Sequence, residues 1–153
     1  MVDIHHSGSC TAPIDVAFDY VDDYRTTTDW MFGLSAFTPV GDQVRGVGAL
    51  FDGTFSIKPV KLSSTVEVTE WRANELIAFT SVKGFTNSST WRFRADGPEL
   101  TTIDVVFSYE LPGGLAGRML GKAMEPIVAL SIRHSEEALR RGIEARHRTS
   151  TDS

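Results

Sequence analysis

The sequence predicts a single α+β domain, in which a curved, seven-stranded antiparallel sheet wraps a long C-terminal helix and encloses an internal cavity. Between residues 34 and 111, short runs of alternating apolar and polar residues are separated by turn residues, as in an antiparallel meander. From residue 115 onward, apolar residues recur at spacings of three and four, as in an amphipathic helix. The chain has 153 residues, and we expect 1–148 to form one domain and 149–153 a disordered tail.

The N-terminal segment predicts one strand and two short helices. Residues 2–10 alternate in polarity, which predicts a first strand with His6 on its inner face. Pro13 fits the first position of a helix, and the apolar residues after it recur at helical spacing. A second short helical segment is expected from Asp22 to Met31, with Trp30 on its apolar side.

Six further strands are expected in the meander. Their predicted bounds are Ala36–Val40, Val47–Phe55, Val60–Trp71, Leu76–Lys83, Asn87–Arg94 and Thr101–Leu111. The Gly-x-Gly at Gly46 and Gly48 is too short for a nucleotide-binding loop, and we interpret it as a bend where two backbones approach each other.

Parity along these strands predicts which face of the sheet is covered, because successive side chains point to opposite sides. The inner set is Phe51, Phe55, Leu62, Val66, Val68, Ile77, Phe79, Trp91, Phe93, Ile103, Val105, Phe107 and Tyr109. Their neighbours of opposite parity, such as Glu67 and Arg92, are polar. The pattern therefore indicates one covered face and one solvated face.

The covering element is a helix expected from Leu115 to about His147. Pro126 lies inside it and predicts a kink. Toward its end, Glu136, Glu137 and Glu144 alternate with arginines, including Arg140, which predicts a solvated charged face.

Composition and charge exclude several functions. The formal charge of -5 and the lack of a basic cluster argue against a nucleic-acid partner. The one cysteine excludes an internal disulfide, and no His, Asp or Glu spacing suggests a metal site or another cofactor. We find no signal peptide and no apolar segment long enough to span a membrane, so we expect a cytoplasmic protein without integral membrane association.

Several motifs carry a resemblance to a known family. They are TAPIDVAFDYVDDYRTTTDWM near the start, the strands GVGALF and STWRF, and ELPGGLAGRMLGK before the terminal helix. With the order of elements, they resemble the polyketide cyclase/dehydrase branch of the START-like (SRPBCC, Bet v 1-like) superfamily over nearly the whole chain. The resemblance implies a helix-grip fold with a deep cavity for lipids, sterols, polyketides, aromatic compounds or hormones. The superfamily includes both carriers and enzymes.

One strand departs from the enzyme pattern of that superfamily. Its aromatic cyclases place tryptophan, serine and arginine at successive alternate positions of a cavity strand. Here the strand from Leu62 to Val68 reads LSSTVEV, with neither tryptophan nor arginine at those positions.

The expected ligand-binding lining combines apolar walls with a few polar groups. Burying a hydroxyl without a partner costs about 1–3 kcal/mol, so inward serines suggest a polar ligand group or water, or else local hydrogen bonds to the backbone. The predicted lining residues are Trp30, Phe32, Phe51, Phe55, Ser64, Val66, Phe79, Ser81, Asn87, Ser89, Trp91, Phe107, Tyr109, Leu120, Met124, Ile127, Val128 and Ser131.

Two residues are candidates for acid–base chemistry. Tyr109 has inward parity, and its hydroxyl is suited to a ligand carbonyl or to a backbone group. His6 also has inward parity, and histidine is the side chain best suited to proton transfer near neutral pH, although a histidine on an edge strand is commonly a surface residue.

Three functions are compatible with these patterns. The first is binding of a hydrophobic or amphipathic small molecule such as a lipid, polyketide or aromatic metabolite, by a monomer or homodimer. The second is a cyclase or dehydratase reaction in the same cavity. The third is an interaction protein with a closed interior and an exposed apolar patch.

Overall fold

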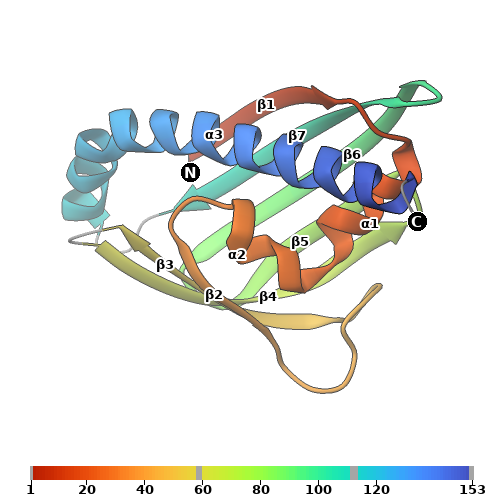
Figure 1. The fold of residues 1–153 in the computed structure, drawn as a ribbon. Helices are drawn as coiled ribbons and strands as arrows, with labels where there is room; N and C mark the ends of the chain where they lie inside the picture. Colours follow the sequence, from red (N-terminus) through yellow and green to blue (C-terminus); the bar gives the residue numbers. More distant parts are fainter. Residues whose placement is uncertain (1, 58–59, 111–113, 152–153) are drawn as a thin grey trace.

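The structure, a computed structural model, describes residues 2–57, 60–110 and 114–151, and the side chains of residues 3–56, 61–110 and 130–149. A curved antiparallel sheet carries helices on one of its faces (Figure 1). The elements are β1 (Val2–Cys10), α1 (Ile14–Asp22), the 3-10 turn η1 (Tyr24–Thr26), α2 (Thr27–Trp30), β2 (Leu34–Pro39), β3 (Leu50–Ile57), β4 (Val60–Arg72), β5 (Leu76–Gly84), β6 (Thr86–Gly97), β7 (Leu100–Glu110) and α3 (Gly114–Thr151).

The seven strands form one sheet in the order β1-β7-β6-β5-β4-β3-β2. Every neighbouring pair is antiparallel, and β2 to β7 follow one another as a meander. The first strand, β1, forms the sheet edge opposite β2 and pairs with β7. In this pair Val2 lies opposite Tyr109 and Cys10 opposite Thr101. The predicted seven-stranded helix-grip fold is confirmed.

The bounds of the first strand are confirmed, whereas those of the first helix shift by one residue. Pro13 is the N-cap residue of α1, with φ of -61° and ψ of 154°, and the helix begins at Ile14. An extended ψ is incompatible with a first helical turn, which explains the difference. The predicted second helical segment is split into η1 and α2, and Trp30 is buried as expected.

The third strand begins at Leu50, three residues later than predicted. Gly46 and Gly48 have φ of 79° and 95°, a backbone region that does not continue a strand. The Gly48 amide donates to the Val68 carbonyl at 2.9 Å, and the Val68 amide donates to the Ala49 carbonyl at 2.9 Å. The bend with closely approaching backbones is therefore confirmed, and it delays the start of the strand.

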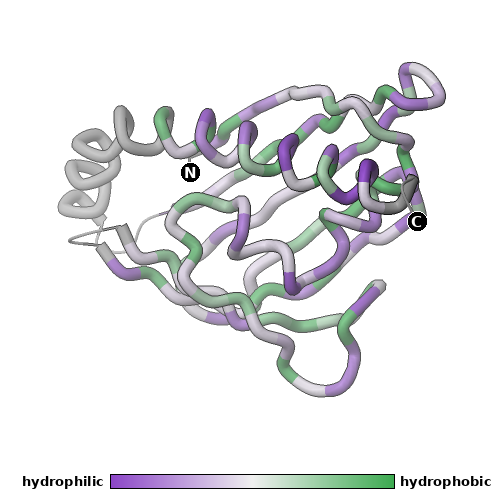
Figure 2. Tube along the Cα trace, in the orientation of Figure 1, coloured by the Kyte–Doolittle hydropathy of each residue, from purple (hydrophilic) through white to green (hydrophobic). Residues whose placement is uncertain are grey.

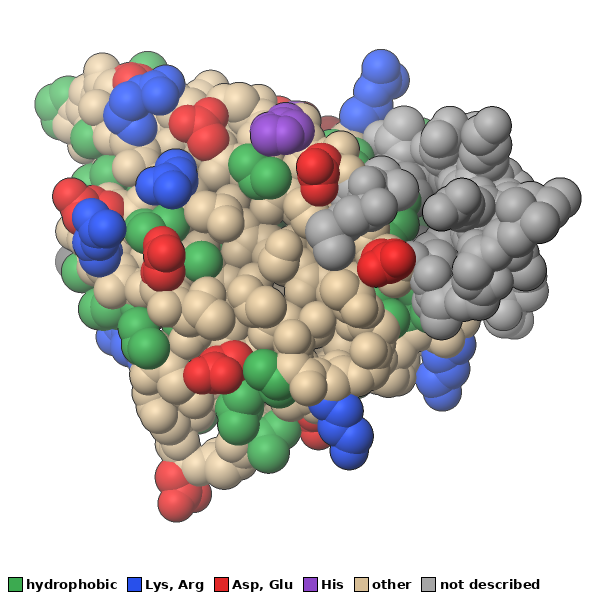
Figure 3. Space-filling view, turned by 180° about the vertical axis from the view of Figure 1, so that it is seen from behind, with side chains coloured by type: hydrophobic (Ala, Val, Ile, Leu, Met, Phe, Trp, Pro, Cys, Tyr) green, Lys and Arg blue, Asp and Glu red, His purple; other side chains and the backbone are tan. Residues whose placement is uncertain are grey.

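The two faces of the sheet differ as parity predicted. Phe51, Val66 and Ile77 of the inner set are buried, whereas Arg92 on the opposite face is exposed. Seen from behind, the outer face shows charged side chains of both signs, with small hydrophobic areas between them (Figure 3). The covered face thus lies on the side of the helices.

A packed core lies where α1 and the end of α3 meet the sheet. The Phe18 ring makes edge-on contacts with Trp71 at 5.6 Å and Phe93 at 5.1 Å between ring centroids. Ile77 and Ile143 are fully buried in the same cluster. Since α3 contacts α1, α2 and β1, this core positions the long helix against one edge of the sheet.

Helix α3 extends to Thr151, so residues 149–151, which we expected in a disordered tail, are helical. The Thr149 hydroxyl donates to the Ala145 carbonyl at 3.0 Å, which continues the helical pattern. Hydrophobic and hydrophilic residues alternate along the described part of α3 (Figure 2). The expected kink at Pro126 falls among residues whose side chains lie outside the described set. Within the described residues, no helix has both the length and the apolar character needed to cross a membrane.

A glycine sets how closely α3 approaches α1. A Cβ added to Gly142 would lie 2.1 Å from the Tyr20 hydroxyl oxygen and 2.5 Å from its Cζ. Tyr20 is itself buried, and the Arg146 guanidinium lies 4.8 Å from its ring centroid. The tyrosine therefore has little freedom to move aside.

We expect Gly142→Ala to destabilise the fold by about 1–3 kcal/mol through overpacking, although alanine is the better helix former by about 1 kcal/mol. Urea unfolding followed by circular dichroism measures the change. Ala145→Gly at an exposed position of the same helix serves as the control and is expected to cost about 1 kcal/mol from helix propensity alone. A stabilised Gly142→Ala variant would contradict the close packing.

Candidate ligand-binding cavity

A cavity of about 240 Å³ lies between the inner face of the sheet and α3. Its volume is near the lower end for small-molecule sites, and its walls are mostly apolar, as such sites require. The described lining residues are Ile4, His6, Gly8, Ser9, Cys10, Trp30, Met31, Phe32, Phe55, Leu62, Phe85, Trp91, Ile103, Val105, Phe107, Tyr109, Ser131, Ile132, Ser135, Glu136, Leu139, Arg140 and Ile143.

Two tryptophans form the central wall. Trp30 from α2 and Trp91 from β6 contact each other edge to face, with ring centroids 5.3 Å apart. Both also line a second cavity of about 70 Å³ that lies toward β2 and β3. The aromatic pair therefore stands between two hollow regions of one interior, and a flat apolar ligand in either region has a ring face to pack against.

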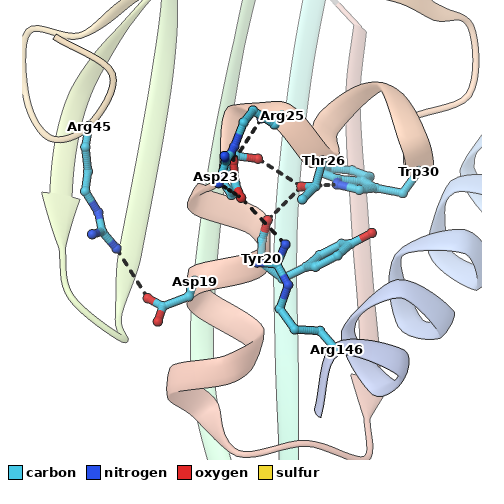
Figure 4. A network of polar contacts seen from close by, with 8 residues as sticks. All are labelled: Asp19, Tyr20, Asp23, Arg25, Thr26, Trp30, Arg45 and Arg146. Atoms are coloured by element: carbon cyan, nitrogen blue, oxygen red, sulfur yellow. Dashed lines mark hydrogen bonds and ion pairs between the residues drawn. The ribbon is translucent and has the colours of Figure 1, made fainter. Parts of the chain in front are cut away.

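A polar network below α2 holds Trp30 in place (Figure 4). The Thr26 hydroxyl donates to the Tyr20 carbonyl at 2.7 Å and accepts from the Trp30 indole nitrogen at 3.3 Å. Asp23 accepts from the backbone and guanidinium of Arg25, and these hydrogen bonds lower the pKa of the Asp23 carboxyl. The indole N–H is thus satisfied beneath the cavity wall while the ring face stays available.

A second set of contacts fastens the loop 40–49 to α1. The Arg45 guanidinium lies 2.5 Å from Asp22 and 3.3 Å from Asp19, and Figure 4 shows the contact with Asp19. The same Asp22 carboxylate accepts from the Trp71 indole at 3.0 Å. Since Arg45 lines the smaller cavity, these contacts determine how closely the loop covers it.

The polar residues predicted for the interior are bonded to one another. Asn87 donates through its side-chain amide to the Ser64 hydroxyl and the Phe85 carbonyl, each at 3.1 Å. Its backbone amide donates to the Ser81 hydroxyl at 3.0 Å. Ser89 similarly accepts from the Trp91 indole at 3.2 Å. Ser64 and Ser81 are therefore partnered across strands by Asn87, and Ser89 is partnered within β6.

An imidazole and a carboxylate lie close together at the edge of the cavity where α3 crosses β1. His6 Nε2 lies 3.1 Å from Glu136 Oε2. Gly8, two residues along β1, leaves the room that the carboxylate uses, because a Cβ there would lie 2.8 Å from Glu136 Oε1. Arg140 is exposed and Glu136 partly exposed, as expected for a solvated helix face, but both also line the cavity, which we did not predict.

Tyr109 and Cys10 occupy opposite ends of the same wall. Tyr109 is buried on β7, and its ring centroid lies 6.0 Å from that of Phe107. Both acid–base candidates, Tyr109 and His6, line the cavity. Burial, followed by the negative charge of Glu144, raises the pKa of the Cys10 thiol to about 11. Cys10 is therefore a neutral, weakly polar part of the lining near neutral pH.

The structure distributes the predicted lining residues over the two cavities. In the larger cavity are Trp30, Phe32, Phe55, Trp91, Phe107, Tyr109 and Ser131, and the smaller adds Phe51, Ser64, Val66, Phe79, Asn87 and Ser89. Ser81 is half-buried and lies outside both sets of described lining residues. Leu120, Met124, Ile127 and Val128 belong to the part of α3 whose side chains lie outside the described set.

Sequence reasoning missed the polar part of α3 that faces the cavity. Glu136 lies four residues after Ile132 and seven before the fully buried Ile143, which places it on the same helix stripe. A second signal was Gly8, which occupies an inward-facing position of β1 and has no side chain. Neither signal identifies the two as neighbours without knowing where α3 crosses the sheet.

A family model described as "Polyketide cyclase / dehydrase and lipid transport" matches residues 1–144. Because the match covers nearly the whole chain, the protein belongs to this family. The predicted resemblance is confirmed. The family description covers both cyclisation or dehydration and lipid transport, so membership is compatible with hydrophobic ligand binding or with a cyclase role.

Solved structures with the same fold include proteins from several bacteria. The ZhuI aromatase/cyclase from Streptomyces has a TM-score of 0.76 at 15% identity, over 95% of this chain and 94% of that one. A protein from Thermus thermophilus has a TM-score of 0.73 at 19% identity, over 97% and 99%. A START superfamily protein from Mycobacterium smegmatis has a TM-score of 0.69 at 15% identity, over 94% and 97%. At these identities the likeness establishes the fold. No curated protein matches the sequence.

Thr26→Val tests the network beneath Trp30. The change keeps the shape of the side chain but leaves the buried Trp30 N–H and Tyr20 carbonyl without their partner, so we expect a loss of about 1–3 kcal/mol in the free energy of unfolding. Urea unfolding measures it. Thr28→Val, at an exposed position two residues away, is the matched control and is expected to change stability by about 0.5 kcal/mol at most. Equal stability of both variants would remove the proposed role of Thr26.

The reactivity of Cys10 tests the burial of the cavity wall. With a pKa of about 11, only about one thousandth of the thiol is ionised at pH 8, and the thiolate is the reactive form. We expect iodoacetamide to modify the native protein at least about 100-fold more slowly than the urea-unfolded chain, with a rate that rises as the pH approaches the thiol pKa. Mass spectrometry follows the reaction at this one cysteine. Similar rates in the two states would contradict the burial.

Proposed function

We propose that this protein binds a hydrophobic or amphipathic small molecule, such as a lipid, a polyketide or an aromatic metabolite, in the cavity under α3. The observation that carries the proposal is the composition of the wall. Apolar and aromatic side chains from β1, β6, β7, α2 and α3 surround about 240 Å³, and polar groups are few. Such a lining obtains affinity from apolar burial and orientation from a small number of hydrogen bonds.

The hydrogen bonding of the interior also favours binding. Asn87, Ser64 and Ser89, which line the smaller cavity next to the larger one, have partners within the protein, so this part of the interior presents no unsatisfied side-chain group of these residues. An apolar ligand next to this part of the sheet therefore displaces no required hydrogen bond. Membership in a family described by lipid transport as well as by cyclase and dehydrase activity agrees with such a site.

A cyclase or dehydratase reaction is the second candidate, and one observation favours it. His6 and Glu136 place an imidazole and a carboxylate 3.1 Å apart on the wall of the cavity that also holds Tyr109. Side chains of these types transfer protons when a reactive ligand is held against them. The same cavity would then orient a chain for reaction.

The first experiment is native mass spectrometry of the protein purified from its own host, followed by extraction of the bound compound. One defined apolar compound per chain, recovered unchanged after incubation, supports binding. Conversion of that compound by the purified protein supports the enzyme instead. A protein that stays free of ligand after exposure to lipid and aromatic libraries argues against both.

A pair of adjacent substitutions tests whether the cavity is the binding site. Val105 faces the cavity and Val106 has the opposite parity, so Val105→Phe places a ring in the cavity whereas Val106→Phe places it outside. We expect Val105→Phe to weaken binding of N-phenyl-1-naphthylamine by about tenfold or more and Val106→Phe to leave it unchanged. Fluorescence titration measures both, with circular dichroism as the check on folding. Equal affinities would exclude this cavity as the site.

A further inference from the structure

The end of the larger cavity next to β1 is polar, and one of its polar atoms lacks a hydrogen-bond partner among the described residues. His6 Nε2 is shielded from solvent and, among the described residues, has no hydrogen-bond partner with acceptable geometry. Glu136 Oε2 lies 3.1 Å away, but out of line for a hydrogen bond. A buried polar atom without a partner is unfavourable, so a ligand group beside the pair would satisfy His6 Nε2 and could also bond the nearby Glu136 carboxylate.

Gly8 provides the space that the Glu136 carboxylate occupies beside His6. Gly8 stands at the inward position next to His6 on β1, and the Glu136 carboxylate lies against it, since an added Cβ would come within 2.8 Å of Oε1. His6 lies opposite Val105 and Gly8 opposite Ile103 in the β1–β7 register, and both of these neighbours are apolar lining residues. The polar pair therefore borders directly on the hydrophobic part of the cavity.

We propose that His6 and Glu136 bind the hydroxyl group of an amphipathic ligand whose apolar body lies along Trp91 and Phe107. This inference rests on the proposed binding function and specifies its ligand class. A histidine nitrogen that carries a proton donates, and an ionised carboxylate accepts. A hydroxyl is the small uncharged group that accepts from the first and donates to the second at one position.

The charges around the pair disfavour other polar ends. A ligand carboxylate would meet the negative charge of Glu136. Arg140, the other charged residue of α3 among the described lining residues, lies 3.8 Å from Glu144 and is already offset by it. A ligand ammonium would lose the contribution of His6, which has no acceptor to offer when its Nε2 is protonated. The arrangement therefore selects an alcohol or phenol.

Binding of three naphthalene probes tests the proposal. Isothermal titration calorimetry compares 2-naphthol, naphthalene and 2-naphthoate on the full chain. We expect 2-naphthol to bind about tenfold more tightly than naphthalene, because two hydrogen bonds are added to the same apolar contact, and 2-naphthoate to bind more weakly than 2-naphthol.

Matched variants assign the preference to the pair. Glu136→Gln is expected to reduce the preference for 2-naphthol over naphthalene to about threefold or less, and His6→Phe, which keeps an aromatic ring but no polar atom, to reduce the same ratio. Glu137→Gln is the control, because Glu137 is exposed on the next helix position and pairs with Arg141. An unchanged preference in both site variants overturns the proposal.

The outcomes separate this inference from the function on which it rests. Equal affinity of 2-naphthol and naphthalene overturns the hydroxyl site but leaves apolar binding in place. Tightest binding of 2-naphthoate also overturns it and assigns the polar end to anions. Failure of all three probes to bind a protein shown to be folded by circular dichroism overturns the binding function itself.

Discussion

The packing of the end of α3 against α1 is the contact on which the rest of the interior depends. Phe18 of α1 packs against Phe93 in the buried cluster that also holds Ile143 of α3, and Gly142 allows the Tyr20 ring to approach α3 directly. On the N-terminal side of this packed end, α3 contacts β1 and borders the cavity. The cavity lies between α3 and the inner face of the sheet, so a dense core at one end of the sheet and a hollow region beside it are parts of one arrangement.

The interior divides its polar groups by location. In the middle of the sheet, Asn87 and the serines around it are bonded to one another and act as a satisfied part of the wall. Next to β1, His6 and Glu136 are close in space without completing a hydrogen bond. The Asn87 group stabilises the walls, whereas the His6–Glu136 pair can still form hydrogen bonds to a ligand. This contrast is the reason for placing specificity at the β1 end and affinity along the aromatic walls.

Several parts of this interior were predictable from local patterns. Parity identified Trp91, Phe107 and Tyr109 as inward-facing, because a strand alternates strictly and each strand carried enough apolar residues to show the phase. Errors came where backbone conformation changes within a few residues, as at Pro13 and Gly46. The position of the partly exposed Glu136 at the cavity was also missed, because its charge indicated solvent and not a cavity wall.

The sequence by itself determined the order of the elements, the covered face of each strand and the amphipathic stripe of the last helix, because these follow from local periodicity and turn residues. Only the tertiary structure decided which residues of α3 meet which residues of β1. That pairing joins His6 to Glu136, positions separated by most of the chain. It depends on the crossing of a helix over a sheet, which side-chain packing at the Phe18 core sets and no local pattern records.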